Sequence, residues 1–368
     1  MLATSKKTFH PRHFHLLARG LHDAGVPVTV IGQPMEGDEP TDIDVRFLPP
    51  RAGRLLRMLS APDVLVRALR LRPGLIQVNS LELLPWAVLA RKLFRTPVIY
   101  DCNEDYAGYM LQKQWVPRPL RRPLSRLVAV CEPWLAARLD ATLFADTLTP
   151  ERFAGRVPRL LVVHNFPWRS LANGSARAEP RYDATYHGSL PTYHATALID
   201  TARILRDRGR RVRWCIAARE YEPDEQRWLR DQVAAAGLED DFTLLFNIPF
   251  ERISEVLTRT RFGLIPLPDT PKFRRNIPRK VFEFMAMGRP AVVSDLPPTR
   301  AIIGDEDCCL LVTPGSERAY ADGLETLLDD PARADAMGRR GRRLIRERLN
   351  AEHELEPYVA LCRELAAA

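Results

Sequence analysis

Short apolar runs alternate with amphipathic segments along the whole chain, and this alternation limits the possible folds more than any other feature. Strands are expected near residues 2–5, 27–31, 75–78, 97–101, 141–145, 160–163, 183–187, 212–217, 242–246, 262–266 and 291–295. Helices are expected near residues 11–24, 51–70, 81–94, 118–138, 193–208, 223–236, 249–259, 279–287, 317–329, 331–348 and 351–367. This pattern is typical of parallel sheets with helices on both faces, so the sequence predicts an α/β fold.

The length of 368 residues allows two domains of ordinary size. Residues 168–182 contain the turn-forming run Asn173-Gly174-Ser175 and are interpreted as a linker. We therefore predict an N-terminal domain at 1–167, a linker at 168–182, a C-terminal domain at 183–348 and a final helix at 349–368 that returns to the first domain.

The six cysteines are scattered without the paired spacing of a zinc site, which favours buried thiols in a reducing cytoplasm. The N-terminus lacks the apolar stretch of a signal peptide, and no run reaches the ~18 apolar residues of a membrane span. The sequence predicts a cytoplasmic protein, at most peripheral on the inner face of the cell membrane.

Positive charge is concentrated in the first half of the chain. Residues 1–168 hold 23 of the 54 Lys and Arg but only 15 of the 46 Asp and Glu. Many of these arginines, between Arg46 and Arg138, alternate with Leu, Met and Val. The pattern suits helices that lie on an anionic bilayer, and it equally suits solvated helix faces in an arginine-rich proteome. No nucleic-acid recognition module accompanies the charge, so no nucleic-acid partner is expected.

Residues 278–290 form the motif with the clearest chemistry. A helix that begins after Pro278 would present backbone N–H groups together with Arg279 and Lys280, a suitable seat for a diphosphate. Glu283 lies one turn after Lys280 on nearly the same face, where its carboxylate could accept hydrogen bonds from ribose hydroxyls. The alternative is a capped amphipathic helix that leads into the strand at 291–295.

In this motif the chain resembles glycosyltransferases of the GT-B fold, and family 4 in particular. The resemblance continues in order through residues 98–106, 186–190 and 310–315. It implies two Rossmann-like domains with a cleft between them. It also implies retaining, metal-independent transfer from a nucleotide-diphosphate sugar to a glycan or lipid-linked acceptor, without a cofactor. Lys280 would then contact the donor phosphates, and Glu283 the ribose.

The donor site departs from the family pattern after its glycine turn. Gly188 stands at the turn where backbone amides would approach a phosphate, with an ordinary structural turn as the alternative. Ser189 and His194 occupy positions where many relatives carry cations, so His194 would supply charge only when protonated. Arg275 replaces a glutamate that relatives place near the transferred sugar, and it could meet the diphosphate or an acidic sugar. The residues expected to compensate for the missing cations are Arg274, Arg275 and Arg279.

The first domain carries polar residues after its strand at 97–101. Asp101, Asn103 and Glu104 are expected to face the acceptor, with Asp105 as a further candidate base and helix capping as the alternative role. Asn79 and Asn103 replace histidines that are frequent in the family, and an amide cannot shuttle a proton near neutral pH. His10 and Arg12 are expected at the edge of the cleft, and His13 and His15 as ordinary helix residues.

The D-x-D spelling at Asp42-Ile43-Asp44 precedes an early strand and is interpreted as chance, so no metal site is predicted. The sequence favours a glycosyltransferase of bacterial surface polysaccharide assembly. Two alternatives stay open: a catalytically inactive binding or scaffold subunit, which the departures at Asn79, Asn103, Ser189 and His194 would fit, and a sugar-nucleotide epimerase.

Overall fold

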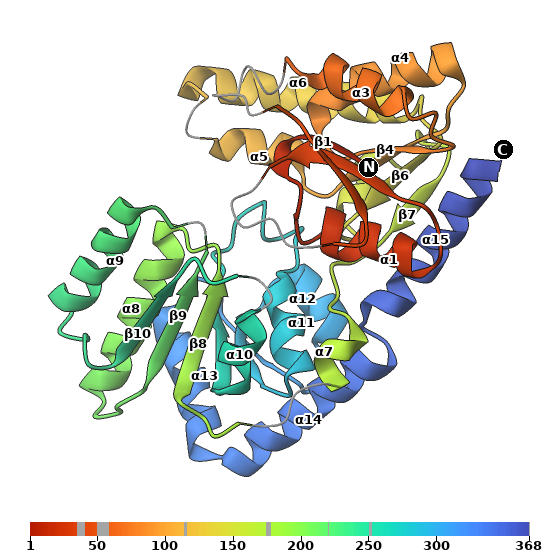
Figure 1. The fold of residues 1–368 in the computed structure, drawn as a ribbon. Helices are drawn as coiled ribbons and strands as arrows, with labels where there is room; N and C mark the ends of the chain where they lie inside the picture. Colours follow the sequence, from red (N-terminus) through yellow and green to blue (C-terminus); the bar gives the residue numbers. More distant parts are fainter. Residues whose placement is uncertain are drawn as a thin grey trace. The chain divides into compact units, whose positions relative to one another are not determined.

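A computed structural model describes residues 1–34, 41–49, 59–113, 116–173, 178–219, 221–249 and 252–367 (Figure 1). The chain forms two compact units. The first consists of Met1–Asn165 with Ala351–Ala368, and the second of Phe166–Asn350. Among the helices of the described ranges, none has the length and apolar character needed to cross a membrane.

The first unit is built on a parallel sheet with the strand order β3-β2-β1-β4-β5-β6-β7. The strands are β1 (Leu2–Lys7), β2 (Thr29–Gln33), β3 (Asp44–Phe47), β4 (Ile76–Val78), β5 (Val98–Cys102), β6 (Ala141–Phe144) and β7 (Leu160–Val162). The chain moves outward from β1 to β2 on one side and returns to β4 on the other. The sheet therefore has its topological switch point between β1 and β4, where ligands bind in open α/β folds.

Helices connect these strands and cover the sheet. They are the π-helix His13–Ala18, α1 (Arg19–Asp23), α3 (Ala61–Leu69), α4 (Leu84–Phe94), α5 (Tyr106–Gln112), α6 (Arg118–Ala136) and α15 (Ala351–Ala367), with 3-10 turns at Leu81–Leu83 and Thr149–Arg152. The core between helices and sheet includes Val78, Leu84, Val98 and Tyr100.

The second unit repeats the arrangement, with the strand order β10-β9-β8-β11-β12-β13. Its parallel strands are β8 (Tyr182–Gly188), β9 (Trp214–Ala218), β10 (Phe242–Phe246), β11 (Thr260–Ile265), β12 (Ala291–Ser294) and β13 (Leu310–Val312). This is the order of a Rossmann fold, and the switch point lies between β8 and β11. The predicted α/β fold with two Rossmann-like domains is confirmed.

The helices of the second unit are α7 (Arg169–Asn173), α8 (Thr192–Asp207), α9 (Pro223–Ala235), α10 (Ile253–Thr258), α11 (Arg279–Ala286), α12 (Pro297–Ile303), α13 (Glu317–Asp329) and α14 (Pro331–Glu347). Helix α11 begins after Pro278; the missing N–H of this proline costs nothing there, because N–H groups at a helix start have no partner within the helix. The helix ends shortly before Gly288, which has a φ of 65°. Its apolar side, including Val281 and Phe282, is buried against the sheet.

Several elements differ from the expectations. The helix expected at 11–24 opens with a π-helix, and the one expected at 51–70 is seen only as α3, because residues 50–58 lie outside the described ranges. Strand β3 and helices α5 and α12 were not predicted. Helix α7 falls within the stretch expected as a linker and packs against α11 and α14. Residues 174–177 of that stretch are not described.

Candidate functional site

The carboxyl ends of β8 and β11 mark the candidate site of the second unit. Gly188 ends β8, and the chain that leaves β11 leads into α11. The turn at Gly188 is held by the backbone N–H of Arg219, which donates to the Gly188 carbonyl at 3.1 Å. The structure thus brings Gly188 and the first turn of α11 together at the switch point, although about 90 residues separate them in the sequence.

Gly188 cannot be replaced at this turn without strain. Its φ of +98° is disfavoured for every residue other than glycine, and an added Cβ atom would lie 2.9 Å from Cε of Lys280. The glycine therefore lets the Lys280 side chain lie directly against the backbone of the turn.

Lys280 is held there by Tyr186. Its Nζ donates to the Tyr186 hydroxyl at 3.2 Å and lies 4.7 Å from the centre of the Tyr186 ring. Burial, together with the nearby charges of Arg219 and Lys272, lowers the pKa of Lys280 to about 8, although Glu283 opposes the shift. A bound phosphate would relieve this clustering of positive charge.

His194 does not replace the missing family cation. It is buried, its Nδ1 lies 2.8 Å from the Tyr186 hydroxyl, and its ring contacts Tyr193 with the ring centres 4.5 Å apart. Burial lowers the pKa of His194 to about 3, and the nearby lysines add to the effect, so the ring is neutral near pH 7. Ser189 accepts through its backbone carbonyl, 2.5 Å from the Tyr186 hydroxyl that donates to it.

Glu283 joins the end of β8 to the start of α11. Its Oε1 lies 2.8 Å from Nε of Arg279, one turn earlier, and its Oε2 lies 3.4 Å from Nε2 of His187. Burial lowers the pKa of His187 to about 4, although Glu283 opposes the shift, so the ring is neutral near pH 7. Only 5% of Glu283 is exposed, so a ligand would meet a carboxylate already oriented by its neighbours.

The two loop arginines before α11 differ in their availability. Arg274 pairs with Asp269, with Nε–Oδ1 and Nη2–Oδ2 distances of 2.5 and 2.7 Å, so its charge is already matched within the loop. Nη1 of Arg275 is buried and has no hydrogen-bond partner among the described residues. A guanidinium N–H in this state is suited to an incoming anion.

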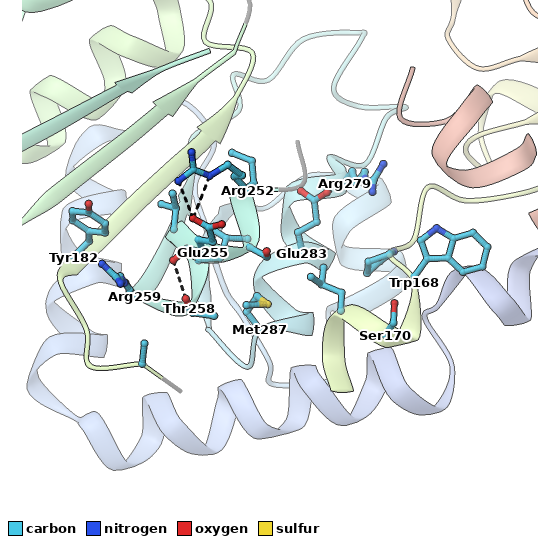
Figure 2. Close-up of a pocket in the computed structure, with 17 residues that line it drawn as sticks. Trp168, Ser170, Tyr182, Arg252, Glu255, Thr258, Arg259, Arg279, Glu283 and Met287 are labelled. Carbon is cyan, nitrogen blue, oxygen red and sulfur yellow. Dashed lines mark hydrogen bonds and ion pairs between the residues drawn. The ribbon is translucent and has the colours of Figure 1, made fainter. Parts of the chain in front are cut away.

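A cavity of about 870 Å³ lies beside Glu283 in the second unit (Figure 2). Arg279, Glu283 and Met287 line one side, and residues of α10 and of the segment around Trp168 line the others. Gly188 and Lys280 are not among its lining residues. Glu283 therefore stands between the cationic turn at Gly188 and a largely apolar space.

In the first unit, Asp101 is locked into a buried ion pair. Nη2 and Nε of Arg12 lie 2.8 and 3.0 Å from its Oδ1, and Nε2 of His13 lies 3.2 Å from its Oδ2. Although burial opposes ionisation, Arg12 and His13 hold the pKa of Asp101 well below its usual range. This geometry argues against Asp101 as a general base. It also corrects the expectations for Arg12, which is buried, and for His13, which pairs with the carboxylate.

The other candidates lie around the carboxyl ends of β4 and β5. Asn79 and Asn103 are buried; Asn79 accepts from the Gln77 amide at 3.1 Å, and Asn103 from the Tyr106 hydroxyl at 3.2 Å. Asp105 caps α5 through the Gly108 N–H. Glu104 is half-buried, and its carbonyl accepts from the Cys102 thiol at 3.5 Å.

The D-x-D residue Asp42 forms ion pairs with Arg19 and His22 at 2.9 and 3.1 Å. The part of the chain that the structure describes holds no group of three or more His, Cys, Asp or Glu side chains arranged to bind a metal ion.

Two family models match the chain, one to each unit. A glycosyl transferase 4-like domain matches residues 11–165, and a glycosyl transferases group 1 domain matches residues 181–330. The chain is a GT-B glycosyltransferase. The predicted resemblance is thereby confirmed. No curated protein sequence matches the enzyme.

Solved structures share the fold of this glycosyltransferase at low identity. A sucrose-phosphate synthase from Thermosynechococcus elongatus is 17% identical with a TM-score of 0.73, over 95% of this chain and 92% of that one. HepE of Anabaena, in complex with UDP and glucose, is 15% identical with a TM-score of 0.67, over 90% and 91%. WaaG, a glycosyltransferase involved in lipopolysaccharide biosynthesis, is 13% identical with a TM-score of 0.65, over 96% and 97%.

Sequence reasoning missed three side chains that organise these sites of the glycosyltransferase. Tyr186 and His187 precede Gly188 within a recognised motif, yet nothing local shows that they reach Lys280 and Glu283. His13 was taken as an ordinary helix residue. Its adjacency to Arg12 and a strand-end Asp101 was the available signal, but only the fold brings the three together.

Proposed function

We propose that the enzyme transfers a sugar from a nucleotide-diphosphate donor, with the diphosphate held at the turn between β8 and α11. The observation that carries this proposal is the convergence of Lys280, the α11 N-terminus and the positive-φ turn at Gly188 on one switch point. Helix N–H groups and two adjacent cations suit a diphosphate. Glu283 would accept from the ribose hydroxyls, and the 870 Å³ cavity beside it has room for a nucleoside.

In this proposal, the residues that differ from the family pattern near Gly188 position other side chains. Ser189 and the neutral His194 hold the Tyr186 hydroxyl, which in turn fixes Lys280. Arg275 supplies the cation that His194 cannot, directed at the diphosphate or at a carboxylate on the sugar.

Transfer proceeds with retention, without metal or cofactor, in the proposed mechanism. The bond from the anomeric carbon to the diphosphate breaks, and the acceptor oxygen bonds on the same face. The acceptor proton passes to an oxygen of the leaving diphosphate, and Arg279, Lys280 and backbone amides stabilise its charge. The ion pairs of Asp101 with Arg12 and of Asp105 with Arg152 support proton transfer to the leaving diphosphate, because neither carboxylate is free to act as a base.

The acceptor would be a glycan or lipid-linked saccharide that meets Asn103 and Glu104, at the carboxyl end of β5. WaaG, which shares the fold, is involved in lipopolysaccharide biosynthesis, and this likeness supports a role for the enzyme in bacterial surface polysaccharide biosynthesis. We place the enzyme in the cytoplasm, where it would reach the inner face of the membrane.

A thermal-shift screen against UDP, GDP, ADP and dTDP tests the donor site. A ligand that binds only the native state stabilises it and so raises the melting temperature. At a ligand concentration of a hundred times the Kd, the free energy of unfolding increases by ~2.7 kcal/mol. One nucleotide should raise the melting temperature of the wild type and not of Glu283→Ala. The matched control is Glu239→Ala, which removes an exposed glutamate elsewhere in the second unit and should keep the shift.

Product analysis then tests turnover and stereochemistry. Transfer from the matching nucleotide sugar, with the anomeric configuration retained by NMR, supports the enzyme. Nucleotide binding with no hydrolysis or transfer would favour the scaffold alternative, and an inverted product would exclude the proposed mechanism.

A further inference from the structure

Large apolar side chains are exposed together on three neighbouring helices of the first unit, α3, α4 and α6. Contacts join α3 to α4 and α4 to α6, and Figure 1 shows the three helices in one layer over the sheet. The exposed apolar residues of this layer are Val66 on α3; Trp86, Leu89, Leu93 and Phe94 on α4; and Leu120, Leu127, Val130 and Trp134 on α6. We refer to them as the apolar face.

Helix α6 carries two separate apolar stripes. The inward stripe, with Val128 and Leu135, packs on the core of the first unit. The outward stripe consists of Leu120, Leu127, Val130 and Trp134, which are 51%, 57%, 64% and 55% exposed. Its spacing of three, four and seven residues puts these side chains on one side of the helix. Packing within the unit explains the inward stripe and leaves the outward stripe without a function in the fold.

Helix α4 adds a second outward stripe. Trp86, Leu89 and Leu93 follow the same helical spacing, and Phe94 ends the helix at 60% exposure. The opposite side of α4, with Leu84, Ala87 and Ala90, is buried. Clustered exposed apolar residues of this kind mark interaction surfaces.

The apolar face is bordered by positive charge with almost no acid. Helix α4 contains no acidic residue, and the sole acid of α6, Glu132, is buried against Tyr100 and Arg152. On α3, Asp63 pairs with Arg67. Exposed basic residues on and beside the three helices include Arg67, Arg70, Arg72, Lys92, Arg95, Arg118, Arg122, Arg126 and Arg138, whose guanidinium lies over the Trp134 ring.

We infer that this surface docks the enzyme on an anionic lipid bilayer, with α4 and α6 lying in the plane of the headgroups. Tryptophan and leucine side chains would enter the boundary with the acyl chains, and the arginines would meet anionic headgroups. A second copy of the chain is a poorer occupant, because self-association would bring two positively charged faces together. The inference goes beyond glycosyl transfer and stands independently of the donor site.

Cosedimentation with vesicles tests the docking surface directly. Vesicles of phosphatidylcholine alone are compared with vesicles of phosphatidylcholine and phosphatidylglycerol in a two-to-one ratio. The wild type should bind the anionic vesicles, and binding should weaken between about 0.1 M and 1 M salt, as the Debye length falls from ~10 to ~3 Å. Trp fluorescence should shift to the blue on binding, and less so in W86F/W134F.

Two triple variants separate charge from apolar insertion. R118E/R122E/R126E should weaken binding by on the order of 100-fold or more, since each basic residue near an anionic surface contributes about fivefold or more. L127E/V130E/W134E should lose the blue shift and bind weakly at any salt concentration. The controls are R333E/R339E/R343E, three exposed arginines on α14, and Phe47→Glu, an exposed aromatic outside the face; both should bind like the wild type.

Equal binding to neutral and anionic vesicles, or unchanged binding by both triple variants, would overturn the inference. Light scattering tests whether a second copy of the chain occupies the face instead. If the wild type does not bind vesicles but forms a dimer, and the triple variants of α6 are monomers, the apolar face mediates self-association. Circular dichroism and the nucleotide-induced thermal shift report whether each variant is folded, so a failed donor site and a failed membrane surface give different results.

Discussion

Nζ of Lys280 lies 3.2 Å from the hydroxyl oxygen of Tyr186, two residues before Gly188 at the end of β8. This contact keeps a positive charge at the turn before any donor arrives. The geometry therefore presents a preorganised cation whose contribution can be tested through its neighbours.

Gly188→Ala should lower stability and nucleotide affinity together. The positive φ costs about 1–3 kcal/mol for a residue with a Cβ, and the added atom would push Lys280 aside. Loss of a charged hydrogen bond predicts about tenfold to 100-fold weaker nucleotide binding. Urea unfolding and titration calorimetry measure the two effects.

Gly209→Ala is the matched control, since Gly209 also has a positive φ, of +75°, but nothing lies within 4 Å of the added Cβ. It should lose stability and keep its nucleotide affinity. Equal loss of affinity in both variants would show that strain alone, and not contact with Lys280, explains the result.

Nucleotide affinity should fall as the pH rises through about 8, because the depressed pKa of Lys280 removes its charge there. The terminal phosphate, with a pKa of ~6, keeps its charge over this range. Lys280→Arg, which stays protonated, should show a flat affinity from pH 7 to 9.5. An identical decline in both proteins would contradict the role of Lys280.

The same shift predicts a rise in stability of the ligand-free protein above pH 8. The folded chain releases the Lys280 proton near pH 8, whereas the unfolded chain keeps it to ~10.4, so unfolding takes up a proton between these values. The stability difference between the wild type and Lys280→Met should therefore move in favour of the wild type across this window in urea unfolding.

Arg275→Ala should weaken binding of the nucleotide sugar by about tenfold to 100-fold, since a charged hydrogen bond to a buried, otherwise unpartnered Nη1 would be lost. Arg274→Ala removes a neighbouring arginine that already pairs with Asp269 and should change affinity by less than about threefold. Calorimetry with the nucleoside diphosphate and with the corresponding nucleotide sugar shows which group Arg275 contacts: a loss of affinity for both ligands indicates the diphosphate, and a loss for the nucleotide sugar alone indicates the sugar. Equal effects of the two substitutions would remove Arg275 from the site.

Asp101→Asn should destabilise the first unit by about 3–5 kcal/mol, because the Arg12 guanidinium would remain buried beside a neutral amide. The exposed pair of Asp63 and Arg67 supplies the control, and Asp63→Asn should cost less than about 1 kcal/mol. The double variant Arg12→Met/Asp101→Leu should recover part of the loss in urea unfolding. Unchanged stability with a large fall in kcat would restore Asp101 as a base.

Strand β5 could be read from the sequence because its burial is uninterrupted. All five residues of β5 are buried, and the run Val98–Cys102 is correspondingly apolar. Strand β3 was missed because its four residues, Asp44–Phe47, alternate charged and apolar at a largely exposed sheet edge. Helix α12 was missed because it begins with Pro297 and Pro298, which also terminate helices in other contexts.

The candidate donor segment was readable because its chemistry is local. Arg279 and Glu283 are one turn apart, so helical periodicity alone brings their charges together, and the structure has them 2.8 Å apart. The pairs Tyr186–Lys280 and Arg12–Asp101 were not readable. Each joins residues 89 or more positions apart, which only the packing of the folded unit brings together.

Periodicity and the order of motifs were thus sufficient for two Rossmann-like sheets and the glycosyltransferase family, because both depend on patterns that repeat over short distances. Those patterns did not show which ionisable groups are charged, and which are free to meet a ligand. Burial keeps His194 neutral, pairs Asp101 with Arg12 and leaves Nη1 of Arg275 without a partner among the described residues. Desolvation and long-range contacts set these states, and both arise only when distant segments of the chain pack together.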